Sequence, residues 1–148
     1  MKTIRLSGEH VFSGLDGIDL LHEHDVRIVG DGPGLTILKP AAECRSVIRG
    51  DQTSNILVEN LTVDGSNLAI YGLRFASSAS SRLTVRNVEI RNTTGRAISA
   101  TGSHTTVTNC WVHDCGEGLG FNPGSSHVRV QSNLIHDIGT EWSQIADG

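Results

Sequence analysis

Apolar and polar residues alternate in short segments that recur along the chain. The segment 106–116 (TVTNCWVHDCG) matches the segment 129–139 (RVQSNLIHDIG) at an offset of 23 residues. Earlier copies cover 83–92 and 56–65, with Val85 lying 22 residues before Val107 and the two copies 27 residues apart. A recurrence of this length, made of strand-sized pieces and turns, predicts a solenoid.

Within each copy, two alternating pieces are separated by a polar elbow. Val85 and Ile90 are expected to point inward, and their polar neighbours outward. A third set of strands is expected between the copies, over 68–75, 96–100 and 118–122. Because so short an alternation cannot bury its own apolar face, each coil needs coils above and below it. The sequence therefore predicts an all-β, three-sheet parallel solenoid of about five coils.

The elbows carry a recurring asparagine. Asn60, Asn87 and Asn109 occupy the equivalent position in three copies, and asparagine tolerates left-handed backbone conformations. Stacked coils would turn these residues into an asparagine ladder. The competing interpretation, a β-sandwich of hairpins, predicts recurring Asn-Gly or Asp-Gly turns, and the two Asp-Gly pairs of this chain do not recur with the repeat.

We expect one domain over 1–148, divided into three parts. These are an irregular lead-in segment (1–25), the coils (26–139) and an unfinished coil (140–148). The Ser-rich run 76–81 lies within one coil and is interpreted as a longer turn. A solenoid that stops in mid-coil exposes unpaired strand edges. Either the sequence is a fragment of a longer protein, or this end is covered by self-association into a homo-oligomer.

Composition narrows the range of partners. The chain has 17 glycines, 4% aromatic and 19% charged residues, and a net charge of −4. This charge gives no footprint for nucleic acid or an anionic membrane surface, and no apolar run approaches the roughly 18 residues of a membrane span. No signal-like apolar stretch follows the first residues. The cysteines Cys44, Cys110 and Cys115 form no zinc-type spacing and are interpreted as buried thiols.

A first candidate site is the outward column that contains His113 and His136. Neighbouring rungs lie about 4.8 Å apart, so the two imidazoles are expected to touch. With Asp114 and Asp137 beside them, the two histidines could orient each other as a pair of general bases, or hold a metal ion. The alternative is that the motif repeats because coils duplicate, and that these residues are solvated turn positions.

A second candidate is a groove on the third strand set. Arg74, Ser99 and Gly120 are the expected outward positions, and they are flanked by Arg96, Glu117 and Asn122. Arginines at such positions can clamp carboxylates in a bidentate manner. The alternative is a set of scattered surface charges without a function.

Trp111 is expected to point outward in a column with Thr62, Glu89 and Leu134. An exposed tryptophan there could stack on a sugar, or seal a contact between subunits. Cover by the N-terminal segment is the third interpretation.

The segments 26–38 (VRIVGDGPGLTIL) and 54–65 (SNILVENLTVDG), and the later Asn-x-x-Val-His-Asp pattern, resemble coils of the pectin-lyase-like superfamily. Its members are right-handed parallel β-helices, and the resemblance covers residues 26–148. It is specific for the fold and much less so for the chemistry.

The resemblance implies binding of an extended, acidic polysaccharide along one sheet, and a secreted or extracellular location. In its lyase and epimerase branches a residue such as Arg or His abstracts the proton alpha to a uronate carboxylate, which Ca²⁺ or another cation neutralises. His113, His136 and Arg96 are the catalytic candidates in this chain, and Asp114 and Asp137 the metal-binding ones. The Asp-Pro-His-Glu motif of the epimerases is absent. A non-catalytic module that binds glycan or assembles with itself is therefore the alternative to an enzyme.

Overall fold

The computed structural model describes residues 1–139; the unfinished coil expected over 140–148 lies outside the described residues. The described chain contains fifteen β-strands and no helix. A first face holds β1 (Lys2–Arg5), β4 (His24–Val29), β11 (Thr106–Thr108) and β14 (Arg129–Gln131), and a second holds β2 (Gly8–Phe12), β5 (Thr36–Pro40), β12 (Trp111–Cys115) and β15 (Leu134–Ile138). The long strands β7 (Ser54–Asp64) and β9 (Ser81–Arg91) contribute to both. The third face holds β3 (Asp16–Asp19), β6 (Cys44–Arg49), β8 (Ala69–Phe75), β10 (Arg96–Ala100) and β13 (Glu117–Phe121).

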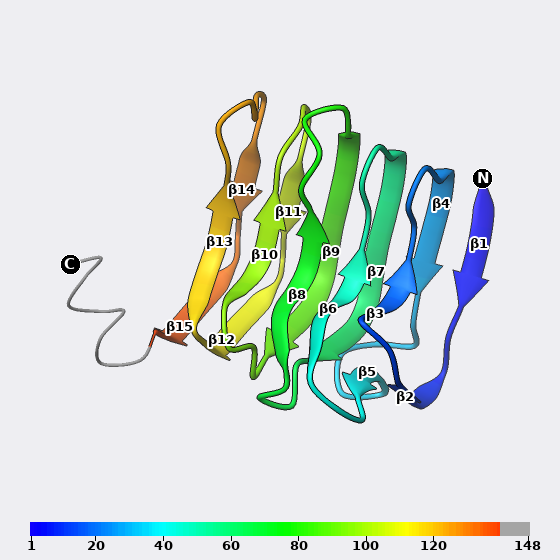
Figure 1. The fold of residues 1–148 in the computed structure, drawn as a ribbon, viewed down its shortest axis with the longest axis vertical. Coiled ribbons are helices and arrows are strands. Elements are labelled where there is room, and N and C mark those ends of the chain that lie inside the picture. Colours follow the sequence, from blue (N-terminus) through cyan, green and yellow to red (C-terminus); the bar gives the residue numbers. More distant parts are fainter. Residues whose placement is uncertain (140–148) are drawn as a thin grey trace.

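All pairings between these strands are parallel, and they join successive coils. Val107 pairs with Val85 on one side and with Val130 on the other, as the repeat predicts. Figure 1 shows the coils side by side, with the N-terminus at one end of the stack and β14 and β15 near the other. The predicted three-sheet parallel β-helix is confirmed, with five full coils followed by the two strands of a sixth.

The N-terminal segment is more regular than the sequence suggested. Residues 1–25 were expected to be an irregular lead-in, yet β1, β2 and β3 pair in register with β4, β5 and β6. The repeated pattern of the later coils has no recognisable copy in 1–25, so periodicity did not reveal that these residues stack on the next coil. The pairing shows that these residues form the first coil.

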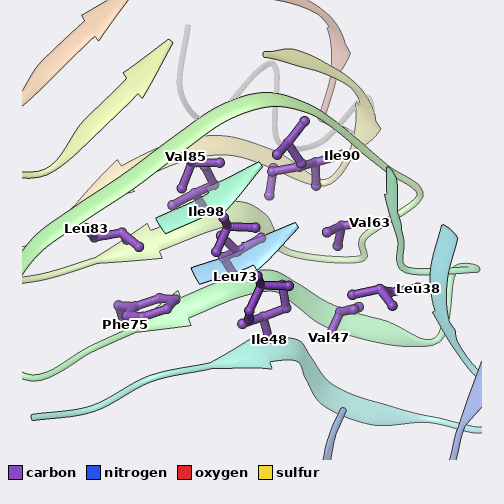
Figure 2. Close-up of a cluster of buried hydrophobic side chains, with 14 of the residues drawn as sticks. Leu38, Val47, Ile48, Val63, Leu73, Phe75, Leu83, Val85, Ile90 and Ile98 are labelled. Carbon is purple, nitrogen blue, oxygen red and sulfur yellow. The ribbon is translucent and has the colours of Figure 1, made fainter. Parts of the chain in front are cut away.

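The core is a narrow column of aliphatic side chains between the three faces. Below the third face, Ile48 pairs with Leu73 and Leu73 with Ile98, and all three are buried. Figure 2 shows these residues packed against side chains from β7 and β9, including Val85 and Ile90. Burying such a side chain contributes about 1.5–3 kcal/mol, so this column fixes the strands that carry the outward residues of the third face.

The elbows adopt the expected left-handed backbone. Asn60 and Asn87 have φ angles of 60° and 51°, and the Asn87 amide donates a 2.9 Å hydrogen bond to Oδ1 of Asn60. Further along, Asn133 lies one position past its elbow. Its amide accepts from the Cys110 N–H at 2.8 Å and donates to the Val107 carbonyl oxygen at 3.0 Å.

The three cysteines are free and buried, as expected. Burial raises the pKa of the Cys110 thiol to about 11. Within residues 1–139, no helix is long and apolar enough to cross a membrane.

Candidate functional site: an arginine cleft and a histidine cluster

The third face is hollowed by a cleft of about 410 Å³. We call it the arginine cleft. It combines four of the residues predicted to bind substrate, together with the catalytic candidate Arg96, with four further residues. Its lining is formed by Ile70, Tyr71, Arg74, Ala76, Gly95, Arg96, Ser99, Glu117 and Asn122.

Arg96 lies across the neighbouring strand β13. Its Nη1 donates to Oδ1 of Asn122 at 2.8 Å and to Oγ of Ser99 at 3.3 Å, and its Nε donates to Glu117 at 3.3 Å. Gly120 leaves room for this arrangement, because a Cβ atom at position 120 would overlap the guanidinium. Nη2 makes no hydrogen bond within residues 1–139, so the guanidinium keeps donors for a ligand.

Arg74 is held more loosely on the adjacent strand. Its guanidinium lies 5.7 Å from the centroid of the Tyr71 ring, and Nη1 is 3.9 Å from Oδ2 of Asp51. The same Asp51 carboxylate accepts a 3.1 Å hydrogen bond from Arg49. In the described part of the chain, the Arg74 side chain makes no hydrogen bond. Two arginines from paired strands therefore line one cleft with N–H donors still open, the arrangement that suits a carboxylate.

The other candidate residues gather on the second face, in a group that we call the histidine cluster. His113 and His136 pair in register, and their rings stack with centroids 5.3 Å apart. Trp111 stacks on His113 at 4.2 Å, and its Nε1 donates to Nε2 of His136 at 2.8 Å. The predicted contact between the two imidazoles is confirmed.

The histidine cluster rests on a buried carboxylate. Glu89 accepts a 2.8 Å hydrogen bond from Thr62 and lies 2.8 Å from Nε2 of His113 and 3.4 Å from Arg91. It is only 3% exposed. The sequence placed Glu89 on the outer surface, which is right for its direction but misses that its neighbours cover it.

Both imidazoles have a polar partner at each ring nitrogen. His113 Nδ1 is 2.6 Å from Asp114, so His113 faces a carboxylate at each nitrogen. Burial lowers the pKa of His113, but the hydrogen bonds and charges of Glu89 and Asp114 outweigh burial and hold that pKa above its ordinary value. His136 receives the Trp111 N–H at Nε2 and lies 2.6 Å from Asp137 through Nδ1. All four ring nitrogens are therefore engaged, and a base role would first require a rearrangement.

The structure does not combine the three residues predicted to be catalytic. Arg96 belongs to the third face, whereas His113 and His136 belong to the second. The metal interpretation also lacks an assembled site: within residues 1–139, no group of three or more His, Cys, Asp or Glu side chains is arranged to hold a metal ion. Asp114 and Asp137 each pair with the adjacent histidine instead. Trp111 is 43% exposed, but it does not line the arginine cleft.

Tyr71 and Ile70 of the cleft, and Asp51 beside Arg74, escaped the sequence reasoning, because they have no like residue at the repeat spacing. A usable signal was that Tyr71 is the only tyrosine of the chain and lies three residues before Arg74.

The stacked coils define a parallel β-solenoid with a polar cleft on one of its sheets. Residues 43–146 match the family described as "Right handed beta helix region". The chain belongs to this family.

Two solved structures share the fold. A candidate glycosyl hydrolase from Parabacteroides merdae superposes with a TM-score of 0.68 and 14% identity over 90% of this chain and 71% of that protein. The A-module of the mannuronan C-5 epimerase AlgE4 from Azotobacter vinelandii gives a TM-score of 0.71 and 20% identity, over 92% of this chain. The chain spans only 42% of that module. A search of the curated proteins gave no match. Both structural neighbours are carbohydrate-related by description.

Proposed function

We propose that this chain binds uronate-containing polysaccharide through the arginine cleft. The observation that carries the proposal is the pair Arg74 and Arg96, which line one cleft on adjacent strands with guanidinium donors still open. A sugar carboxylate offers two oxygens that match the fork of a guanidinium. The carbohydrate-related structural neighbours are in keeping with this class of ligand.

Binding is favoured over proton abstraction by the state of the candidate bases. The guanidinium of Arg96 donates hydrogen bonds but has no lone pair with which to accept a proton. The nitrogens of His113 and His136 are engaged on another face. The primary role of Arg96 is thus to orient an acidic sugar.

A lyase or epimerase activity is the second candidate, and Tyr71 favours it. Its side chain lines the cleft beside the two arginines, where a phenol could exchange a proton with the carbon alpha to a bound carboxylate. Incubation with pectate and alginate, with and without Ca²⁺, tests this version. Ultraviolet absorbance of unsaturated uronate would report elimination, and proton NMR of the polymer would report epimerisation. If neither signal appears with any of the polymers, the enzymatic version is refuted.

The binding proposal is tested by calorimetric titration with oligouronates and with neutral oligosaccharides of equal length. We expect binding of the acidic series alone. Arg96→Gln should weaken it about 10- to 100-fold, since a hydrogen bond to a charged group contributes about 1.5–3 kcal/mol. Arg129→Gln, on the exposed strand β14 of the first face, is the matched control and should leave the affinity unchanged. Equal loss in both variants would indicate diffuse attraction and contradict a cleft.

A further inference from the structure

A second hollow adjoins the arginine cleft, with a volume of about 570 Å³. Ile70 lines both, so the two hollows share a wall. The wall is kept thin by Gly95, where a Cβ atom would come within 3.0 Å of Cγ2 of Ile70. A ligand held by the arginines therefore lies beside Ile70, which also borders the neighbouring hollow.

The second hollow is apolar where the first is polar. Leu15 and Ile70 line it and are 61% and 46% exposed, and Leu68 and Cys44 complete its apolar part. Exposed aliphatic side chains that converge on one hollow lose water contact only when an apolar group enters.

The charged groups of this hollow do not favour a second carboxylate. Arg45 donates to both oxygens of Asp16, at 3.1 and 2.5 Å, so its charge is already compensated. Glu43, which also lines the hollow, would repel an anion. The group that fits is small, apolar and uncharged.

We propose that this hollow takes the O-acetyl group of an acetylated uronate whose carboxylate lies in the arginine cleft. The inference rests on the proposed function and adds the substituent that the site selects. An O-acetyl ester places an acetyl group, which ends in a methyl, on a hydroxyl oxygen of the sugar, and it leaves the carboxylate for Arg74 and Arg96. A methyl ester of the carboxyl group would remove the very charge that the arginines bind. Of the two esters, only the O-acetyl ester leaves a carboxylate for the arginine cleft and also offers an apolar group to the second hollow.

The test compares oligouronates of one length in de-acetylated, O-acetylated and methyl-esterified form, titrated against the full chain. We expect the acetylated oligomer to bind about fourfold more tightly than the de-acetylated one, the effect of burying roughly one methyl group. The methyl-esterified oligomer should bind most weakly. In Ile70→Thr and in Leu15→Ser the acetyl preference should shrink toward unity. Leu35→Ser is the matched control, since Leu35 is 66% exposed and lines neither hollow.

The outcomes separate the two proposals. If none of the oligomers binds, the proposed function fails. If the de-acetylated oligomer binds and acetylation gives no gain, or if the gain survives in both hollow variants, only the acetyl inference is overturned. A gain with the methyl ester in place of the acetyl ester also overturns it. Circular dichroism of each variant confirms that a changed preference belongs to a folded protein.

Discussion

The arginine cleft and the histidine cluster use similar residues in opposite ways. In the histidine cluster every ring nitrogen has a partner, and Glu89 is buried beneath the rings. In the cleft, Arg96 retains an open donor and Arg74 makes only a long ion pair and a ring contact. A group whose hydrogen bonds are complete contributes to stability, whereas a group with open donors at a hollow surface can bind. The difference agrees with the proposed function, in which the histidine cluster holds the coils together and the arginine cleft binds the ligand.

The largest expected effect concerns the stability of the histidine cluster. Glu89→Gln should lower the free energy of unfolding by about 2 kcal/mol, because a hydrogen bond to a charged group contributes about 1.5–3 kcal/mol and the variant leaves His113 with Asp114 and Arg91 with Asp64 as their remaining carboxylate partners. Urea unfolding followed by circular dichroism measures this effect. Glu117→Gln is the matched control: Glu117 has a 53% exposed side chain and should cost at most about 0.5 kcal/mol. An equal loss of unfolding free energy in Glu89→Gln and Glu117→Gln would contradict a stabilising role that is specific to the histidine cluster.

The pH dependence of stability sharpens the same contrast. The pKa of His113 in the folded protein lies above its ordinary value because Glu89 and Asp114 outweigh burial. Its contribution is therefore complete below the ordinary pKa of about 6.5, and it is lost as pH rises through the higher folded value. Unfolding free energies measured from pH 6 to 9 should fall over this window in the native chain and stay flatter in His113→Gln. An identical slope in both proteins would show that His113 is not the titrating group.

Stability at acid pH has a separate origin, on the first face. Burial raises the pKa of Glu59, but its hydrogen bonds to Arg86 and Arg27 outweigh burial and lower it overall. This contribution is present above the ordinary glutamate pKa and is lost as pH falls through the lower folded value. His113→Gln should not change how the unfolding free energy falls at acid pH. This acid range therefore provides an internal control for the pH experiment.

A smaller effect is expected from moving Arg96 without removing it. In Gly120→Ala the new methyl group occupies the place of the guanidinium, which must swing away from Asn122. Oligouronate affinity should fall about tenfold, equivalent to one lost hydrogen bond to a charged group, with little change in unfolding free energy. Gly118→Ala on the same strand is the control, because its Cβ atom meets only ordinary contacts at 3.8 and 3.9 Å. Normal affinity in Gly120→Ala would show that the position of Arg96 is unimportant.

The smallest effect is expected at Trp111. Trp111→Ala should leave oligouronate affinity within about twofold, because Trp111 belongs to the second face and does not line the cleft. The same titration as for Arg96→Gln measures it. A loss of affinity as large as that of Arg96→Gln would indicate that the sugar contacts the histidine cluster, and it would contradict binding in the arginine cleft.

Register was predictable from the sequence because it follows from periodicity alone. Val85, Val107 and Val130 stack, and so do His113 and His136, since equivalent positions of successive copies fall on neighbouring rungs. The outward row of Arg74, Ser99 and Gly120 was predictable for the same reason.

Lateral side-chain contacts were not predictable in this way. Arg96 reaches over Gly120 to Asn122, a contact that depends on the rotamer of a long side chain rather than on the spacing of residues. Tyr71 and Ile70 occur without repetition, so no pattern marks them. Glu89 faces outward as expected, but its burial depends on how Trp111, His113 and Arg91 close over it, which alternation along one strand does not reveal.

The placement of Arg74 and Arg96 on separate coils has an evolutionary consequence. Neighbouring coils are about 4.8 Å apart, so duplicating or deleting one coil would move the two guanidinium groups by a fixed step while leaving each turn intact. The length of sugar chain recognised could thus change in whole increments through gene rearrangement, without any redesign of the individual contacts.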